Sequence, residues 1–160
     1  MEKLLLFALM AVMWVTAHAQ QMDEEMAMKA LFQAKHAVNR AAHAAVQQLD
    51  AAQLAHGKLW IDSVSASNAT KTYLMGNLQL DNNLKPIAGS YLRHPVEIVV
   101  FKVINADELF PYTYRNSAYN YEVTLQHPGV ILIIHLDYPR VFDVIEPIDW
   151  YVKGVAELSG

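Results

Sequence analysis

Residues 22–55 read MDEEMAMKALFQAKHAVNRAAHAAVQQLDAAQLA and contain neither glycine nor proline. Apolar residues recur in this stretch at spacings of three and four, the repeat that places side chains on one face of an α-helix. The sequence therefore predicts a long Ala-rich amphipathic helix within residues 20–57, ended by Gly57. Its apolar stripe consists of Met22, Met26, Ala30, Ala34, Val38, Ala41, Ala45 and Leu49.

This stripe is rich in alanine and poor in leucine. Small side chains allow another helix or a sheet to approach the helix backbone closely. Two partners are open at this point: the sheet of the same domain, or helices of neighbouring subunits in an assembly. Burial of apolar surface would drive either contact, at about 25 cal/mol per Å².

Residues 1–19 have the layout of a secretory signal peptide. Lys3 precedes the apolar run Leu4–Val15, and the small residues Ala17 and Ala19 occupy positions −3 and −1 of a cut before Gln20. The run is short for a membrane span, which needs about 20 apolar residues. However, the chain has no glycine or proline before residue 57, so the run can also continue into the next helix as a retained membrane anchor. Both interpretations place residues 20–160 outside the cytoplasm.

Residues 58–160 are expected to form an α+β head. Asp62 or Ser63 can cap a second helix, Val64–Leu78, and Leu80–Pro95 has the composition of a connecting loop. The β-branched segment Val96–Ile104 predicts a buried strand.

The remaining strands are predicted from alternation and turn signals. Tyr119–Gln126 and Val130–Leu136 are expected to pair as a hairpin across Pro128-Gly129, which suits a type II turn. A short strand, Val141–Ile145, and a last strand, Trp150–Leu158 with Gly154 as a candidate bulge, follow. The expected fold is α+β and pilin-like: a long N-terminal helix and a second helix packed on an antiparallel sheet of about four strands.

Composition excludes several classes of function. The chain has no cysteine, which excludes disulfide frameworks, thiolate metal sites and cysteine nucleophiles. Its net charge is −4 and its basic residues are scattered, which argues against nucleic acid as a partner. With 54% apolar residues, the chain can bury a core and hold itself together by packing alone.

No catalytic, cofactor-binding or metal-ligating set is predicted, so the chain is not expected to be an enzyme. His36 and His43 lie seven residues apart on the first helix, too far to chelate one ion. His135 falls inside an apolar strand and is interpreted as a partly buried histidine, because no G-x-S-x-G nucleophile motif accompanies it.

Asp143 and Glu146 would be the pair of carboxylates for glycoside hydrolysis. Together with Asp137 and Asp149 they are interpreted as loop-end acids, and no D-x-D-x-D-G loop points to calcium.

Four tyrosines gather in FPYTYRNSAYNY, residues 110–121: Tyr112, Tyr114, Tyr119 and Tyr121. Tyrosine suits interfaces because its side chain is large, stiff and amphipathic. The segment is therefore a possible contact loop for a protein or a sugar, with ordinary packing at a sheet edge as the alternative.

The segment from Phe32 to Leu78 resembles the TadE/TadG-like pilus-assembly proteins, in which an Ala-rich helix follows a hydrophobic N-terminal segment. The resemblance covers about the first half of the chain. The matching residues are Asn39, Ala41, Ala42, Ala44, Ala45, Gln48, Leu49 and Asp50, then Ala66, Ala69, Tyr73, Leu74, Asn77 and Leu78. The chain departs from the family in its shorter apolar run, and it has no G-x-x-x-x-E ahead of that run.

The resemblance implies a non-enzymatic envelope protein, a pilin-like or pilus-assembly subunit held by its N-terminal helix. Its expected partners are other pilus or envelope subunits, and the membrane if the N-terminal segment is uncleaved. The alternative is a secreted monomeric binding domain that uses residues 112–121. A third class, an envelope hydrolase, would use Asp143 and Glu146 or His135.

Overall fold

The computed structural model describes residues 2–138, 140 and 148–158. The helices are α1 (Glu2–Val46), α2 (Ala51–Ala55) and α3 (Ser63–Leu78). The strands are β1 (Glu97–Ile104), β2 (Tyr112–Asn116), β3 (Tyr121–Leu125), β4 (Gly129–Tyr138) and β5 (Ile148–Glu157), with one 3₁₀ turn at Ser117–Tyr119. The predicted α+β class with a long N-terminal helix is confirmed, and the antiparallel strands form one sheet of three and one of two.

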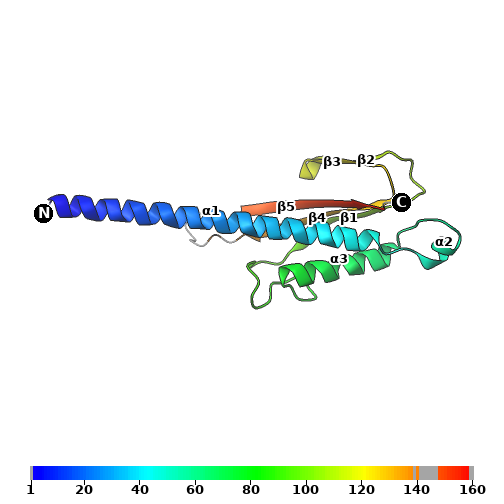
Figure 1. Ribbon diagram of the computed structural model, residues 1–160, viewed down its shortest axis with the longest axis horizontal. Helices are drawn as coiled ribbons and strands as arrows, with labels where there is room; N and C mark the ends of the chain where they lie inside the picture. Colours follow the sequence, from blue (N-terminus) through cyan, green and yellow to red (C-terminus); the bar gives the residue numbers. More distant parts are fainter. Residues whose placement is uncertain (1, 139, 141–147, 159–160) are drawn as a thin grey trace.

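The head has three layers (Figure 1). The central sheet has the order β1-β4-β5, and α1 and α3 cover one of its faces while the β2–β3 hairpin covers part of the other. Successive side chains of a strand point to opposite faces. Leu132 and Ile134 of β4 accordingly belong to the core shared with the helices, whereas Ile131 packs with Leu125 beneath the hairpin.

Helix α1 runs without a break for 45 residues, as the absence of glycine and proline allows. Its predicted end near Gly57 is wrong, because the helix stops at Val46. The carboxylate of Asp50 instead caps the separate helix α2 by accepting hydrogen bonds from the backbone N–H groups of residues 52 and 53. Leu49 forms an antiparallel bridge with Ile61, which ties the start of the head back to the end of α1.

Helix α3 has the predicted bounds to within one residue. Asp62 is its N-cap and accepts hydrogen bonds from the backbone N–H groups of Val64 and Ser65. Its buried residues are Ala66, Thr70, Leu74 and Leu78, which recur every four residues and so form one face of the helix.

The predicted hairpin across Pro128-Gly129 is wrong. Strand β3 pairs with β2, and β4 pairs with β1 and β5. Gly129 is the residue at which the chain passes from the hairpin into the central sheet. A Cβ there would lie 2.5 Å from the carbonyl oxygen of Ala156 and 2.6 Å from Cδ2 of Leu125, so only glycine fits between the two layers.

Gly154 is not at a bulge. It pairs in regular register with Leu132, and the register shift of the central sheet falls between Ile98 and Val100 of β1. A Cβ at residue 154 would lie 2.6 Å from Cγ1 of Val38, so this glycine permits close contact between β5 and α1. The predicted strand Val141–Ile145 lies outside the described residues.

Candidate functional site

The first half of α1 is exposed on all sides and projects beyond the sheet (Figure 1). It contains an 18-residue window with mean hydropathy 1.4, none of it buried, which is long and apolar enough to cross a membrane. A signal sequence at the N-terminus would have the same properties. The predicted cleavage residues Ala17, Ala19 and Gln20 all lie inside the uninterrupted helix.

The predicted packing stripe divides into two parts. Met22 and Met26 are 60% and 44% exposed. Leu49 lies beyond the end of the helix and is half-buried. The middle of the stripe is buried against α3 and the central sheet, and it consists of Ala30, Ala34, Val38, Ala41 and Ala45.

The four tyrosines belong to the β2–β3 hairpin rather than to a loop. Tyr112, Tyr114 and Tyr121 are half-buried and pack against the core residues beneath the hairpin. Lys102 of β1 donates a hydrogen bond of 2.6 Å to the Tyr112 hydroxyl. Tyr119 lies in the turn between the two strands, and its ring is 5.1 Å from that of Tyr151.

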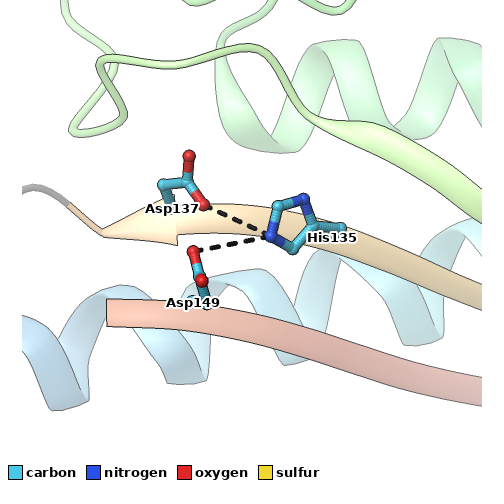
Figure 2. A group of neighbouring side chains, drawn as sticks. All are labelled: His135, Asp137 and Asp149. Carbon is cyan, nitrogen blue, oxygen red and sulfur yellow. Dashed lines mark ion pairs between the residues drawn. The ribbon is translucent and has the colours of Figure 1, made fainter. Parts of the chain in front are cut away.

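A histidine–carboxylate cluster lies where β4 ends and β5 begins, on the same face of the central sheet as Ile131 and the hairpin (Figure 2). Nε2 of His135 is 3.3 Å from Oδ1 of Asp137 and 3.6 Å from Oδ1 of Asp149. The other ring nitrogen, Nδ1, is 3.8 Å from Oε2 of Glu97. Asp137 uses its second oxygen, Oδ2, to contact Nδ1 of His94 at 3.2 Å.

Strand register explains why these residues meet. His135 and Asp137 are two residues apart on β4, so their side chains share one face. His135 pairs with Glu97 on β1 and with Tyr151 on β5, and Asp137 pairs with Asp149. The His135 ring also stacks on Tyr151 with centroids 4.8 Å apart, which helps to fix its orientation.

Opposing effects act on the carboxyl of Asp137. Burial raises its pKa, but the hydrogen bond with His94 and the charges of His135 and His94 lower it, and the net shift is downward. The Asp137 carboxyl is therefore ionised at neutral pH.

This cluster was not predicted from the sequence. The pattern His-x-Asp at 135 and 137 would have shown that two donor groups share one strand face, but the positions of Glu97 and Asp149 depend on pairing with other strands. His36 and His43, the histidines considered first, are both exposed on α1. Asp143 and Glu146, the possible hydrolase pair, lie outside the described residues.

Comparison of the chain with protein-family models, with curated proteins and with solved structures finds no match. We therefore infer function from the geometry of α1 and of the head.

Proposed function

We propose that the chain is a non-enzymatic envelope protein, a pilin-like or pilus-assembly subunit that α1 holds in a membrane with its head on the extracytoplasmic side. One observation carries this proposal: a single unbroken helix has an exposed apolar first half and a second half that is built into the core of the head. A membrane would cover the first half, which the head leaves bare.

The dimensions of the exposed half suit a bilayer. The uncharged segment Leu4–Met22 lies between Lys3 and Asp23. At 1.5 Å per residue this segment is about 28 Å long, close to the roughly 30 Å of a hydrocarbon core. Helical geometry also satisfies every backbone hydrogen bond inside the segment, as a lipid environment requires.

The continuity of α1 favours a retained anchor over a cleaved signal. Proteases cut most readily at exposed, locally unfolded backbone. The predicted cut between Ala19 and Gln20 falls in mid-helix, more than 25 residues before the helix ends at Val46. The signal-like layout of residues 1–19 supports export of the head.

Assembly is supported by exposed apolar side chains between the proposed membrane span and the head. Met26, Met28 and Phe32 are 44%, 50% and 60% exposed on α1. Met28 and Phe32 are four residues apart and so share one face of α1, whereas Met26 lies on a different face. Exposed apolar surface of this kind is typical of protein–protein contact. The resemblance of residues 32–78 to TadE/TadG-like proteins points to the same role.

A fractionation experiment tests the anchor. Met13 lies near the middle of the proposed span, where an arginine costs about 2.5–3.5 kcal/mol. We expect the wild-type protein to have the mass of the uncleaved chain and to require detergent for extraction. In Met13→Arg, a large fraction of the protein should be found in the soluble fraction without detergent. Val64→Arg is the control, because Val64 is 71% exposed on α3 and far from the span in sequence.

Two outcomes would reject this proposal. A soluble protein with the mass of residues 20–160 would show a cleaved signal and favour a secreted binding domain.

The orientation of the head is tested with Asn82→Cys, since the chain has no other cysteine and Asn82 is exposed in a turn of the head. Failure of a membrane-impermeant maleimide to label Cys-substituted protein in intact cells would exclude an extracytoplasmic head.

A further inference from the structure

We propose that His135, Asp137 and Asp149 bind one divalent transition-metal ion of the zinc class at the end of the central sheet where β4 ends and β5 begins. The three residues each offer one ligand atom, and these atoms all lie within 4.8 Å of one another. Two adjacent antiparallel strands supply them, so the backbone hydrogen bonds of the sheet hold the donor atoms in place.

The distances match those around a zinc ion. Two ligand atoms bound about 2.1 Å from a tetrahedral zinc lie about 3.4 Å apart. Nε2 of His135 lies 3.3 Å and 3.6 Å from the two aspartate oxygens. An ion can therefore enter between these atoms with only small side-chain rotations.

The surrounding groups orient the ligands. A metal-bound histidine usually donates its other ring N–H to a carboxylate. Oε2 of Glu97 lies on that side of His135, 3.8 Å from Nδ1, which is longer than a hydrogen bond. His94 contacts Oδ2 of Asp137, which leaves Oδ1 directed at His135 (Figure 2). Within the described residues, this buried Oδ1 atom has no hydrogen-bond partner. A buried carboxylate oxygen without a hydrogen bond is costly, and metal coordination removes that cost.

Charge also favours a bound cation. Asp137 and Asp149 are directly opposed on neighbouring strands, an arrangement in which like charges destabilise a sheet. In the part of the chain that the structure describes, the ion pairs of these two carboxylates come from histidines rather than from lysine or arginine.

The donor set selects the class of metal. Calcium and magnesium prefer ligands that are all oxygen, whereas an imidazole with two carboxylates suits zinc and its transition-metal neighbours. Bound metal would join the end of β4 to the start of β5. It would stabilise the folded head by RT ln(1 + c/Kd), where c is the free metal concentration, so the stability would rise with the logarithm of the metal concentration once the site is mostly occupied.

The experiment uses the full chain in detergent and titrates Zn²⁺ by calorimetry, with bound zinc counted per chain after dialysis. Asp149→Asn is the main variant, because its side chain is 72% exposed and its loss is compatible with folding. We expect one Zn²⁺ per wild-type chain, and at least tenfold weaker binding in both Asp149→Asn and His135→Gln. Zinc should also raise the unfolding temperature of the wild type and not that of Asp149→Asn.

Matched controls separate this site from adventitious binding. Asp107→Asn and His36→Gln remove an exposed acid and an exposed histidine elsewhere, and each should leave zinc affinity unchanged. Equal affinity in the wild type and Asp149→Asn, or a wild-type dissociation constant weaker than about 1 mM, would overturn the proposal. Neither result bears on the membrane anchor, which is tested separately by fractionation.

Discussion

Gly154 of β5 faces Val38 of α1 so closely that a Cβ on residue 154 would lie 2.6 Å from Cγ1 of the valine. Real Cβ atoms do not approach other atoms this closely, so α1 or β5 must move if residue 154 is larger than glycine. This contact sets the distance between the long helix and the central sheet.

We expect Gly154→Ala to lower the free energy of unfolding by about 1–3 kcal/mol, the usual cost of overpacking a core. Urea unfolding of the full chain in detergent measures the change. Gly76→Ala is the control, because a Cβ at that position in α3 meets nothing within 4 Å. That control should raise stability by roughly 0.5–1 kcal/mol, since alanine is the better helix former. Equal effects of the two substitutions would show that the close contact at Gly154 is unimportant.

A second prediction concerns Asn105, which is 8% exposed at the end of β1. Its side chain accepts a hydrogen bond of 2.8 Å from the backbone N–H of Ile61 and donates one of 3.1 Å to the carbonyl oxygen of Ile61. Asn105→Ala leaves both backbone groups buried without these partners, so we expect a loss of about 1–3 kcal/mol in thermal unfolding. Asn82→Ala, in an exposed turn, should change stability by less than about 0.5 kcal/mol.

A third prediction concerns pH. The hydroxyl of Ser65, followed by the N–H of Val64, hydrogen-bonds the Asp62 carboxylate and holds its pKa below the ordinary value. A carboxyl whose pKa is lower in the folded state stabilises the fold above its unfolded pKa, and this contribution is lost as the pH falls through the folded pKa. We therefore expect Asp62→Asn to be less sensitive than wild type to acid below about pH 4. The measurement is the free energy of unfolding of the wild type and of Asp62→Asn, at pH 7 and at pH 3. The difference between the two proteins should be smaller at pH 3 than at pH 7. The same difference at both pH values would contradict this role of Asp62.

A fourth prediction separates folding from assembly. Ala41 and Ala45 are fully buried within the head, so Ala41→Leu should destabilise the monomer by about 1–3 kcal/mol through overpacking. Met28→Lys and Phe32→Lys replace exposed side chains on one face of α1, so they should leave unfolding nearly unchanged while weakening association between chains. Chemical cross-linking in detergent and in native membranes measures association, with Val64→Lys as the exposed control. Association that is unaffected by both lysines would exclude this surface of α1 as the contact.

Local signals predicted the helices better than the strands. The possible caps Asp62 and Ser63 and the helical spacing of Ala66, Ala69, Tyr73, Leu74 and Leu78 are both encoded within one segment, and the predicted bounds of α3 followed from them. Strand pairing depends on residues far apart in sequence, and Pro128-Gly129 resembled a turn although it carries the chain between two layers. The strand from Tyr121 was predicted within Tyr119–Gln126, but its partner Tyr112–Asn116 was predicted as part of a contact loop, and the structure shows a short strand there.

The candidate metal site shows the same limit. His135 and Asp137 share a strand face, which alternation alone could have indicated. Glu97 and Asp149 reach them only through the register of β1 and β5 with β4. The packing stripe was predicted as one continuous surface, but the head covers only its middle, because the sheet is shorter than the helix (Figure 1).

The unbroken helix α1 has a mechanical consequence if the chain is anchored as we propose. The same backbone would cross the bilayer and form part of the core of the head, without a glycine or proline to act as a joint. Asp23, just after the uncharged segment, contacts Arg140 beyond the end of β4 at 3.3 Å, so the sheet is tied to α1 close to the membrane surface. The protein would then behave as a rigid lever: a pull on the head would tilt or rotate the membrane segment with it.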